Sequence, residues 1–379
     1  MQIHYFSEKL KSHCRRSDTG RGYLLTLIVV CGLALASCSA PAPTPPAAQT
    51  AASSKDQMPG FWRNAKRRVS FDGSAANLSL ITRTLGEGLY QRIGPGFIWA
   101  VFGARGHAYY DGLIALGEGE VDFAMVTPPV VAQMAMEGKG YFNKPYPNLR
   151  GVAVYPQNDW LGCAVLSKMG ISSFEDIKAK KPALRIATGP IGQNDGVGFL
   201  AEQLLQAYGI SVKDIEAWGG KFLEARTSGV AVQKVLDGEA DMACHEAWKS
   251  FYALVAKFPV QFLPVSEEVL NQMQQQFGFQ RNVIRKGLYA PNVPERDTPV
   301  VDFSDWVLIT TTQLPDDLAS LTAQVAVENR KDVEVFYTSV SERERGMDLP
   351  LRPEIMWKNV GVPLHPGAEK YYKENGYMK

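Results

Sequence analysis

The chain has 379 residues, of which 45% are hydrophobic and 21% are charged, and its formal net charge is +1. This length and composition suffice for two globular domains with sizeable cores. A net charge this close to zero gives no electrostatic signature of nucleic acid or acidic membrane surfaces, so we expect no nucleic-acid partner.

The first 37 residues have the pattern of a secretory signal peptide. Basic residues that include Arg15 and Arg16 precede an apolar run at 23–36, which is shorter than the roughly 20 residues that span a bilayer. The run ends in Leu35-Ala36-Ser37-Cys38, which looks like a bacterial lipobox. We therefore expect cleavage before Cys38 and acylation of that cysteine with palmitate. An uncleaved anchor or ordinary secretion is the alternative, and the residues after Arg16 do not fit a twin-arginine signal.

Residues 38–65 are rich in Ala, Pro, Thr and Ser, a composition that predicts a flexible tether. Beyond Cys38, the mature chain has two cysteines, Cys163 and Cys244. Both lie in apolar, strand-like contexts. We expect two buried thiols, with a single disulfide as the alternative.

From residue 67 onward, strands and helices alternate, which favours parallel sheets with helices on both faces. Strands are expected at 67–71, 97–102, 149–155, 161–166, 184–187, 260–265 and 306–310. Helices are expected at 78–92, 174–179, 196–208, 267–277, 315–329 and 366–375. Residues 156–159 look like a crossover between two lobes, and the Pro-rich residues 281–299 receive no assignment.

One six-residue phrase occurs twice, as Gly119-Glu120-Val121-Asp122-Phe123-Ala124 and as Gly238-Glu239-Ala240-Asp241-Met242-Ala243. Each copy follows an amphipathic run and leads into an apolar stretch. This pattern predicts a helix, a glycine stop, an acidic turn and a buried strand. Ligands of open α/β sheets bind at the carboxyl ends of strands, so the repeat predicts two similar lobes that face one cleft. Coincidence in a short pattern is the alternative.

Glycine-containing loops at 73–77, 103–107 and 189–196 each lie between an expected strand and an expected helix. Free backbone N–H groups and the helix dipole make such positions suitable for a carboxylate or phosphate. None matches the dinucleotide or P-loop pattern, so we expect no nucleotide and no other cofactor. Arg105 is the natural countercharge for an anion, or else a solvated loop arginine.

The run Cys244-His245-Glu246 suggests metal or nucleophilic chemistry at first sight. Neighbouring residues of a strand point to opposite faces, however, so the three side chains are not expected to converge. No sequence motif of a hydrolase or a zinc site is present, and we predict neither an enzyme nor a metal site. We expect His245 or Glu246 to hydrogen-bond a ligand, and Trp160 and Trp248 to form apolar walls or core.

From residue 69 onward the chain resembles the TAXI solute receptors of TRAP transporters. The resemblance is carried by the phrase at 116–124, Tyr155-Pro156, Gly189-Pro190, Phe222-Leu223-Glu224-Ala225 and, above all, the closing segment at 361–372. It implies a monomeric receptor with the type II periplasmic-binding-protein fold, in which two α/β lobes close on a small anionic solute. Such a carboxylate or amino acid, for example glutamate, would be delivered to a TRAP-type membrane permease.

The resemblance implies lobe I at 66–158 and 298–379, and lobe II at 159–297. It also implies a set of ligand-binding residues: Ser74, Ala75, Ala76, Arg105, His107, Thr127, Trp160, Gln193, Asn194, Asp195, His245, Glu246 and Trp248. The chain departs from the family at Asp72, which would repel an anion, and at 103–107, which adds positive charge. We expect a periplasmic protein that is anchored by lipid on Cys38. The sequence does not decide between the inner and the outer membrane. A ligand-sensing or scaffolding lipoprotein without a transport role is the alternative.

Overall fold

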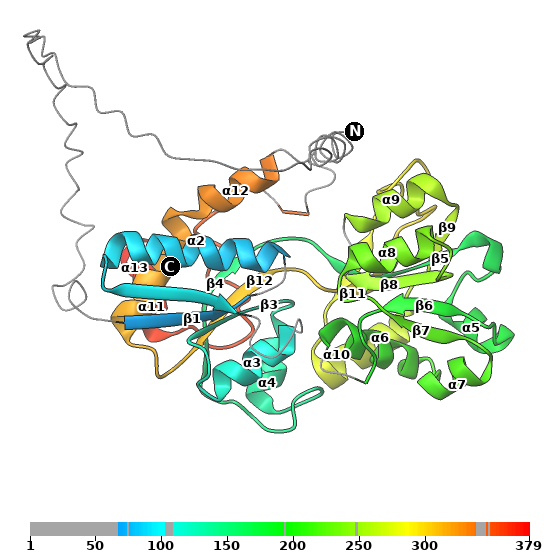
Figure 1. The fold of residues 1–379 in the computed structure, drawn as a ribbon, viewed down its shortest axis with the longest axis horizontal. Helices are drawn as coiled ribbons and strands as arrows, with labels where there is room; N and C mark the ends of the chain where they lie inside the picture. Colours follow the sequence, from blue (N-terminus) through cyan, green and yellow to red (C-terminus); the bar gives the residue numbers. More distant parts are fainter. Residues whose placement is uncertain are drawn as a thin grey trace, which may run out of the picture. The chain divides into compact units, whose positions relative to one another are not determined.

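Two β-sheets with helices packed around them form the described part of the chain in a computed structural model (Figure 1). The structure describes residues 67–73, 76–102, 109–192, 195–246, 249–338, 346–347 and 349–379. All of them belong to one unit, Ser54–Lys379.

The first sheet has the strand order β2-β1-β3-β12-β4. Its strands are β1 (Arg67–Asp72), β2 (Phe97–Phe102), β3 (Phe123–Val126), β4 (Leu149–Tyr155) and β12 (Trp306–Thr311). Strand β1 pairs in parallel with β2 and β3, whereas β12 is antiparallel to β3 and β4. The carboxyl ends of β1, β2 and β3 therefore share one edge.

The second sheet repeats this arrangement. It runs β10-β11-β5-β8-β6-β7, and β9 pairs with β5. The strands are β5 (Trp160–Leu166), β6 (Arg185–Thr188), β7 (Lys221–Glu224), β8 (Met242–Glu246), β9 (Val260–Phe262), β10 (Arg281–Ile284) and β11 (Thr298–Asp302). Strand β6 is parallel to β7 and β8, and β5 is antiparallel to β8. Strands β6, β7 and β8 thus correspond to β1, β2 and β3.

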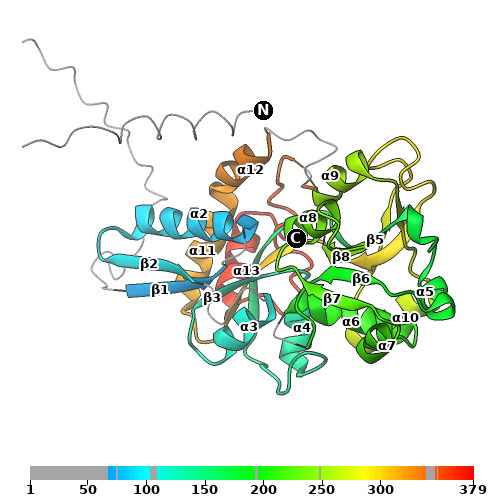
Figure 2. The ribbon, with the colours of Figure 1, turned by 45° about the vertical axis from the view of Figure 1, so that its right-hand side comes forward.

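Helices cover both sheets (Figure 2). The first sheet carries α2 (Ala76–Ile93), α3 (Tyr109–Gly117), α4 (Val130–Glu137), α11 (Asp316–Glu328), α12 (Arg330–Thr338) and α13 (Pro366–Glu374). The second carries α5 (Phe174–Lys180), α6 (Gly196–Ala207), α7 (Val212–Ala217), α8 (Ser228–Leu236), α9 (Ser250–Lys257) and α10 (Glu267–Phe277). Side chains that favour N-caps start several of them, for example Ser173 at α5 and Ser211 at α7.

Both copies of the repeated phrase have the predicted structure. Helices α3 and α8 each end just before a glycine in the left-handed region, Gly119 with φ 78° and Gly238 with φ 76°. In both copies the N–H of the next glutamate donates to a carbonyl in the last turn of the helix. Strands β3 and β8 then follow and are almost entirely buried. The helix, glycine stop and buried strand are confirmed twice.

Two segments connect the sheets and run beside each other. The N–H of Phe303 donates to the carbonyl of Asp159 at 3.0 Å, and the N–H of Asp305 donates to the carbonyl of Gln157 at 3.0 Å. The expected return strand at 306–310 is confirmed as β12. Strand β11 lies in the second sheet although it follows the lobe boundary expected at residue 297, because its Val301 and Asp302 pair with β5. The precise lobe limits stay a prediction.

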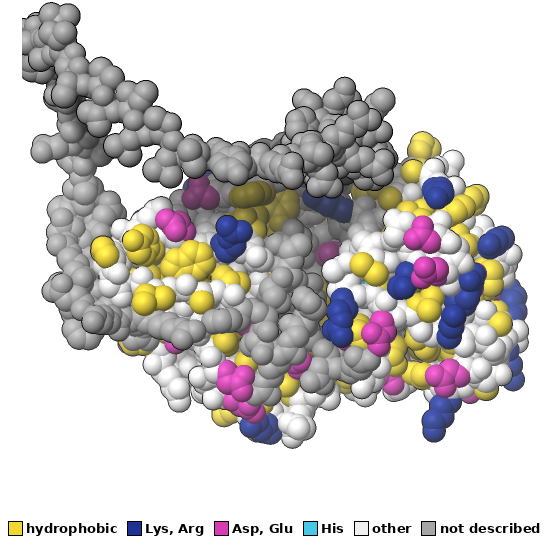
Figure 3. All heavy atoms as spheres, in the orientation of Figure 1, with side chains coloured by type: hydrophobic (Ala, Val, Ile, Leu, Met, Phe, Trp, Pro, Cys, Tyr) yellow, Lys and Arg dark blue, Asp and Glu magenta, His cyan; other side chains and the backbone are white. Residues whose placement is uncertain are grey.

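The apolar core is continuous between the two sheets. One cluster of buried side chains includes Val126 of β3, Leu161 of β5 and Phe303 between β11 and β12. Separate clusters fill the outer sides of the first sheet and of the second sheet. On the surface shown in Figure 3, acidic and basic side chains are interspersed over the helices of the second sheet.

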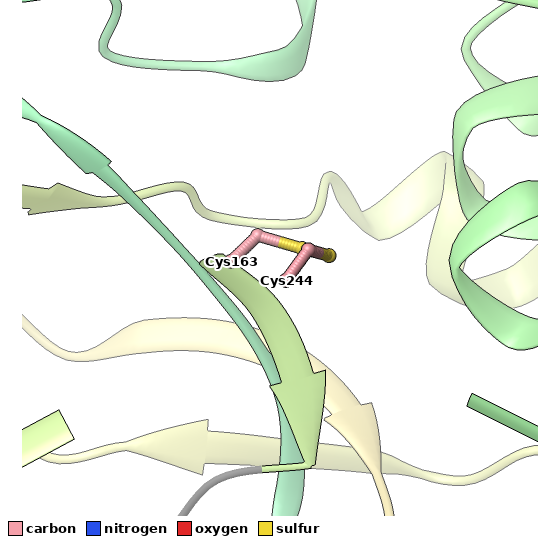
Figure 4. The surroundings of a disulfide bond; sticks show 2 residues. All are labelled: Cys163 and Cys244. Carbon is pink, nitrogen blue, oxygen red and sulfur yellow. A yellow bond between two sulfur atoms is a disulfide. The ribbon is translucent and has the colours of Figure 1, made fainter. Parts of the chain in front are cut away.

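Cys163 of β5 and Cys244 of β8 form a disulfide (Figure 4). The expectation of two free buried thiols is therefore wrong. The strands are antiparallel neighbours, and their register places these two residues directly opposite each other. Both were correctly expected in apolar strands, but the sequence did not show that the two strands are paired.

Candidate functional site

The carboxyl edge of the second sheet brings together polar side chains from β6 and β8 and a backbone carbonyl that follows β7. Thr188 ends β6, Ala225 follows β7, and His245 and Glu246 end β8. Side chains at such an edge face the crevice in which open α/β folds bind their ligands. The described part of the candidate site is built at this edge.

His245 is buried and makes hydrogen bonds through both ring nitrogens. Nε2 lies 3.0 Å from the carbonyl oxygen of Ala225, and Nδ1 lies 3.1 Å from Oε2 of Glu246. Burial by itself lowers the pKa of His245, but the Glu246 carboxylate and these hydrogen bonds outweigh it, and the net pKa is raised. His245 and Glu246 contact each other at the end of β8 but, as expected, the three side chains of the run do not converge on one atom. The sulfur of Cys244 is held in the disulfide.

Asp195 is the N-cap of α6. Its Oδ1 accepts the N–H of Gly198 at 2.8 Å, and the residue is 5% exposed. Burial raises the pKa of this carboxyl, and hydrogen bonds from Gly198 and Val197, with the charges of His245 and Arg226, offset part of that shift. A β-carbon at Gly189 would collide with the carboxylate, so glycine is needed there. The N-terminus of α6, expected to host a ligand anion, is thus already capped by a carboxylate of the protein.

Tyr110 brings the first lobe onto this edge. A β-carbon at Gly196 would lie 2.6 Å from Cε1 of Tyr110 and 3.0 Å from Cζ, the atom that carries the hydroxyl. The ring also packs edge-on against Phe199 of α6 and Tyr141. Tyr110 is fully buried, its pKa is raised by burial and by the charge of Asp195, and its hydroxyl has no hydrogen-bond partner. A helix of one sheet therefore presents an unsatisfied donor to the helix start of the other.

Thr188 supplies a second unsatisfied hydroxyl. The residue is fully buried, and its Oγ1 has no hydrogen-bond partner. It immediately precedes Gly189, which lies against Asp195. Native proteins leave few buried polar atoms unpaired, because each costs roughly 1–3 kcal/mol. Each of the two lobes thus holds a buried hydroxyl without a partner among the described residues, that of Tyr110 in the first and that of Thr188 in the second.

Acidic side chains also occur on the first-lobe side. Asp72, at the end of β1, is buried, and its carboxylate fills the place where a side chain at Gly112 in the first turn of α3 would lie. Asp111 of α3 is buried and accepts the hydroxyl of Tyr141 at 2.9 Å. The pKa of Tyr141 is raised by burial, then by Asp111, and also by Asp195. The carboxylates of Asp111 in the first lobe and Asp195 in the second therefore both raise the pKa of Tyr141.

Two other expected ligand residues occupy internal positions. Oγ1 of Thr127 donates to the carbonyl of Phe303 at 3.1 Å, which ties the end of β3 to the connection between the sheets. Trp160 is 1% exposed and packs in the apolar cluster that contains Phe251 and Tyr289. A ligand role for either residue stays a prediction.

The remaining expected positions lie outside the described residues. These are Cys38, Ser74, Ala75, Arg105, His107, Gln193, Asn194 and Trp248, together with the side chain of Ala76 at the start of α2. The structure brings together Asp195, His245 and Glu246, and it adds Tyr110, Thr188 and Arg226, which the sequence reasoning missed. Arg226 follows β7 as Arg105 follows β2, so the strand correspondence could have identified it.

Within the described ranges, no helix is long and apolar enough to cross a bilayer. The same residues contain no group of three or more histidine, cysteine or acidic side chains arranged to hold a metal ion.

The strand order and the two connections between the sheets are those of the type II periplasmic-binding-protein fold. The sequence matches a family model over residues 110–376, described as the NMT1-like family. The chain belongs to this family. Solved structures that it resembles include a TctC solute-binding protein from Polaromonas, with 13% identity over 74% of this chain and 90% of that chain and a TM-score of 0.41.

Two other similar structures contain a bound ligand. MatC from Rhodopseudomonas palustris with bound malate shares 12% identity over 82% of this chain and 97% of that chain, with a TM-score of 0.48. A TRAP periplasmic solute-binding protein from Sulfitobacter with bound β-D-galacturonate shares 11% identity over 82% and 96%, with a TM-score of 0.39.

Proposed function

We propose that this NMT1-like protein is an extracytoplasmic solute-binding receptor that captures a small polar organic molecule between two lobes. The observation that carries the proposal is the packing of the buried Tyr110 of one lobe against the start of α6 in the other, where Asp195 is the N-cap and the Tyr110 hydroxyl has no hydrogen-bond partner among the described residues. Ligand sites of this kind are concave and hold a few convergent polar groups. Binding without chemical conversion fits the described site, because its thiol candidate, Cys244, is tied to Cys163.

Closure of the lobes is the proposed mechanism. The paired segments around Asp159 and Phe303 supply the hinge, since they alone join the two sheets in the described chain. A ligand that contacts Tyr110 on one lobe and the β6–β8 edge on the other binds the closed state better than the open state. It therefore shifts the population toward closure by the difference between these two affinities.

The sequence resemblance supports a more specific assignment, to the TAXI receptors of TRAP transporters. The segment at 361–372 and the repeated phrase are typical of TAXI receptors, so we propose that the closed protein delivers its solute to a TRAP-type permease. We further propose that the mature monomer is anchored in the periplasm through lipid on Cys38. Carboxylates and amino acids, glutamate included, are the first solutes to test.

A thermal-shift screen of the mature chain tests the receptor function. A ligand at 100 times its Kd should stabilise the folded state by about 2.7 kcal/mol, which is visible as a higher melting temperature. Tyr110→Phe should reduce the shift, because the ligand loses a hydrogen bond. Tyr371→Phe, at a buried tyrosine of α13, is the matched control and should leave it unchanged. A screen of carboxylates, amino acids, amines, sugars and phosphonates that stabilises nothing would reject the proposal.

A further inference from the structure

We infer that aromatic side chains on the facing surfaces of the two lobes form a latch that stabilises the closed state, in which Phe199 of α6 contacts both Tyr110 and Tyr141 of the first lobe. This inference rests on the proposed lobe closure and adds what the protein itself contributes to it. The elements that carry the latch, α3 and α4 in the first lobe and α6 and α10 in the second, are neighbours in Figure 1 and in Figure 2.

The ring of Phe199 contacts rings of both lobes. Its centroid lies 6.1 Å from that of Tyr110 and 6.0 Å from that of Tyr141, and both pairs are edge-on. In its own lobe, Phe199 packs against Phe277 of α10 at 5.6 Å. Ring pairs at such separations attract each other beyond the effect of the surface that they bury. Movement of the lobes away from each other would break the first two contacts and keep the third.

Two glycines let the lobes approach closely beside these rings. Gly140 has φ 60°, and a β-carbon there would lie 3.2 Å from Cδ1 of Phe277 and 3.4 Å from Cζ of Phe199. Gly278 follows α10 with φ 88°, and a β-carbon there would lie 2.8 Å from Cγ2 of Val130 in α4. The contact between the lobes thus extends from the rings to the backbone on both sides.

The first-lobe side of the latch is held in place by its own lobe. The hydroxyl of Tyr141 donates to Oδ1 of Asp111 at 2.9 Å. The ring of Tyr141 meets those of Tyr110 and Phe142 at centroid distances of 5.0 and 5.5 Å. Tyr110 and Phe142 are buried, and Phe199 and Tyr141 are half-buried against the same apolar cluster. Because these rings are already ordered, little side-chain freedom is lost when the lobes meet, and burial of Phe199 favours closure.

Double electron–electron resonance between two spin labels measures the populations of open and closed lobes. The ligand-free mature chain carries Cys38→Ser, and the labels are attached through Gln133→Cys in α4 and Gln206→Cys in α6, two exposed positions. Phe199→Ala removes both ring contacts between the lobes, so it should raise the ratio of long to short label distances about tenfold or more. Phe199→Leu keeps a large apolar side chain, so it should preserve the fold and raise the ratio by a smaller factor.

Phe258→Ala is the matched control, because Phe258 is also half-buried in the second lobe but packs against the apolar cluster of that lobe. Its ratio should equal that of the wild type. Tyr141→Ala should also open the lobes, and its combination with Phe199→Ala should open them little further than Phe199→Ala does, because both remove the same ring contact.

Two results would overturn the latch, and they differ in what they say about the proposed function. If two label distances are seen but Phe199→Ala and Tyr141→Ala leave their ratio at the wild-type value, the latch is wrong while lobe closure stands. If the wild type and every variant show one unchanged distance, lobe closure itself fails.

Discussion

The two copies of the repeated phrase have the same backbone but different roles. In the first copy, the N–H of Asp122 donates to the carbonyl of Ser70 in β1; in the second, the N–H of Asp241 donates to the carbonyl of Arg185 in β6. In both, the aspartate carboxylate also accepts the N–H of that same residue of the neighbouring strand, which fixes the turn to the sheet. The shared glycine and aspartate therefore set the backbone of each unit.

The residues after this shared part decide what each copy does. In the first copy, Thr127 follows β3 and ties it to the connection at Phe303. In the corresponding part of the second copy, β8 ends in His245 and Glu246, which form the polar edge beside Asp195. One copy is tied to the connection between the sheets, and the other ends at the candidate site. A repeated unit thus preserves the positions of its strand ends while the side chains there diverge.

Removing the disulfide, which only the second unit has among the described residues, should cause the largest loss of unfolding free energy. Cys244 in β8 corresponds to Met125 in β3, and only the second unit is crosslinked among the described residues. The bond closes a sequence separation of 81 residues, so Cys163→Ala/Cys244→Ala should lower the free energy of unfolding by about 4 kcal/mol. Urea denaturation measures the loss. Reductant should destabilise the wild type and not the double variant; a wild type indifferent to full reduction would contradict this.

Replacing the aspartate of each repeated phrase should cost less unfolding free energy than removing the disulfide, and the cost should be larger for Asp241 than for Asp122. Asp241 accepts Nε and Nη2 of Arg185 at 2.8 and 2.6 Å, and the Arg185 guanidinium lowers the pKa of Asp241. Asp122 accepts only the N–H and hydroxyl of Ser70. Asp241→Ala should therefore cost about 3 kcal/mol of unfolding free energy, and Asp122→Ala about 1–2 kcal/mol. Equal costs would show that the shared backbone bond, rather than the ion pair, dominates both turns.

The two buried histidines, His245 and His365, should have the smallest effects on stability, and their contributions should change with pH in opposite directions. The pKa of His245 is raised, so its contribution to stability is present below about 6.5, the ordinary value, and is lost as pH rises through the folded-state pKa. Burial lowers the pKa of His365, the N-cap of α13, so its contribution is present above about 6.5 and is lost as pH falls through the folded-state pKa.

Unfolding free energies at pH 5 to 9 test this contrast. The stability advantage of the wild type over His245→Gln should shrink as pH rises, and its advantage over His365→Asn should grow. Each slope should stay below about 1.4 kcal/mol per pH unit, the limit for one proton. Slopes of the same sign would show that a different group titrates.

The sequence predicted much of the fold because its signals are local. The glycines after α3 and α8, the apolar strands and the alternation of helices with strands depend on neighbouring residues only. The same local logic failed for Cys163 and Cys244, because strand pairing joins residues far apart in the chain. The local pattern also did not show that His245 and Glu246 contact each other at the end of β8.

The sequence by itself therefore determined the two related α/β units and their repeated turn, and it predicted the sheet edge at which we propose that a ligand binds. Only the tertiary structure decided which side chains meet there. Tyr110 appeared in the sequence as one residue of an amphipathic helix, and Asp195 as part of a loop open to an anion. Packing of α3 against α6 buries the tyrosine hydroxyl beside a carboxylate that already caps its helix, and this depends on contacts that no local pattern contains.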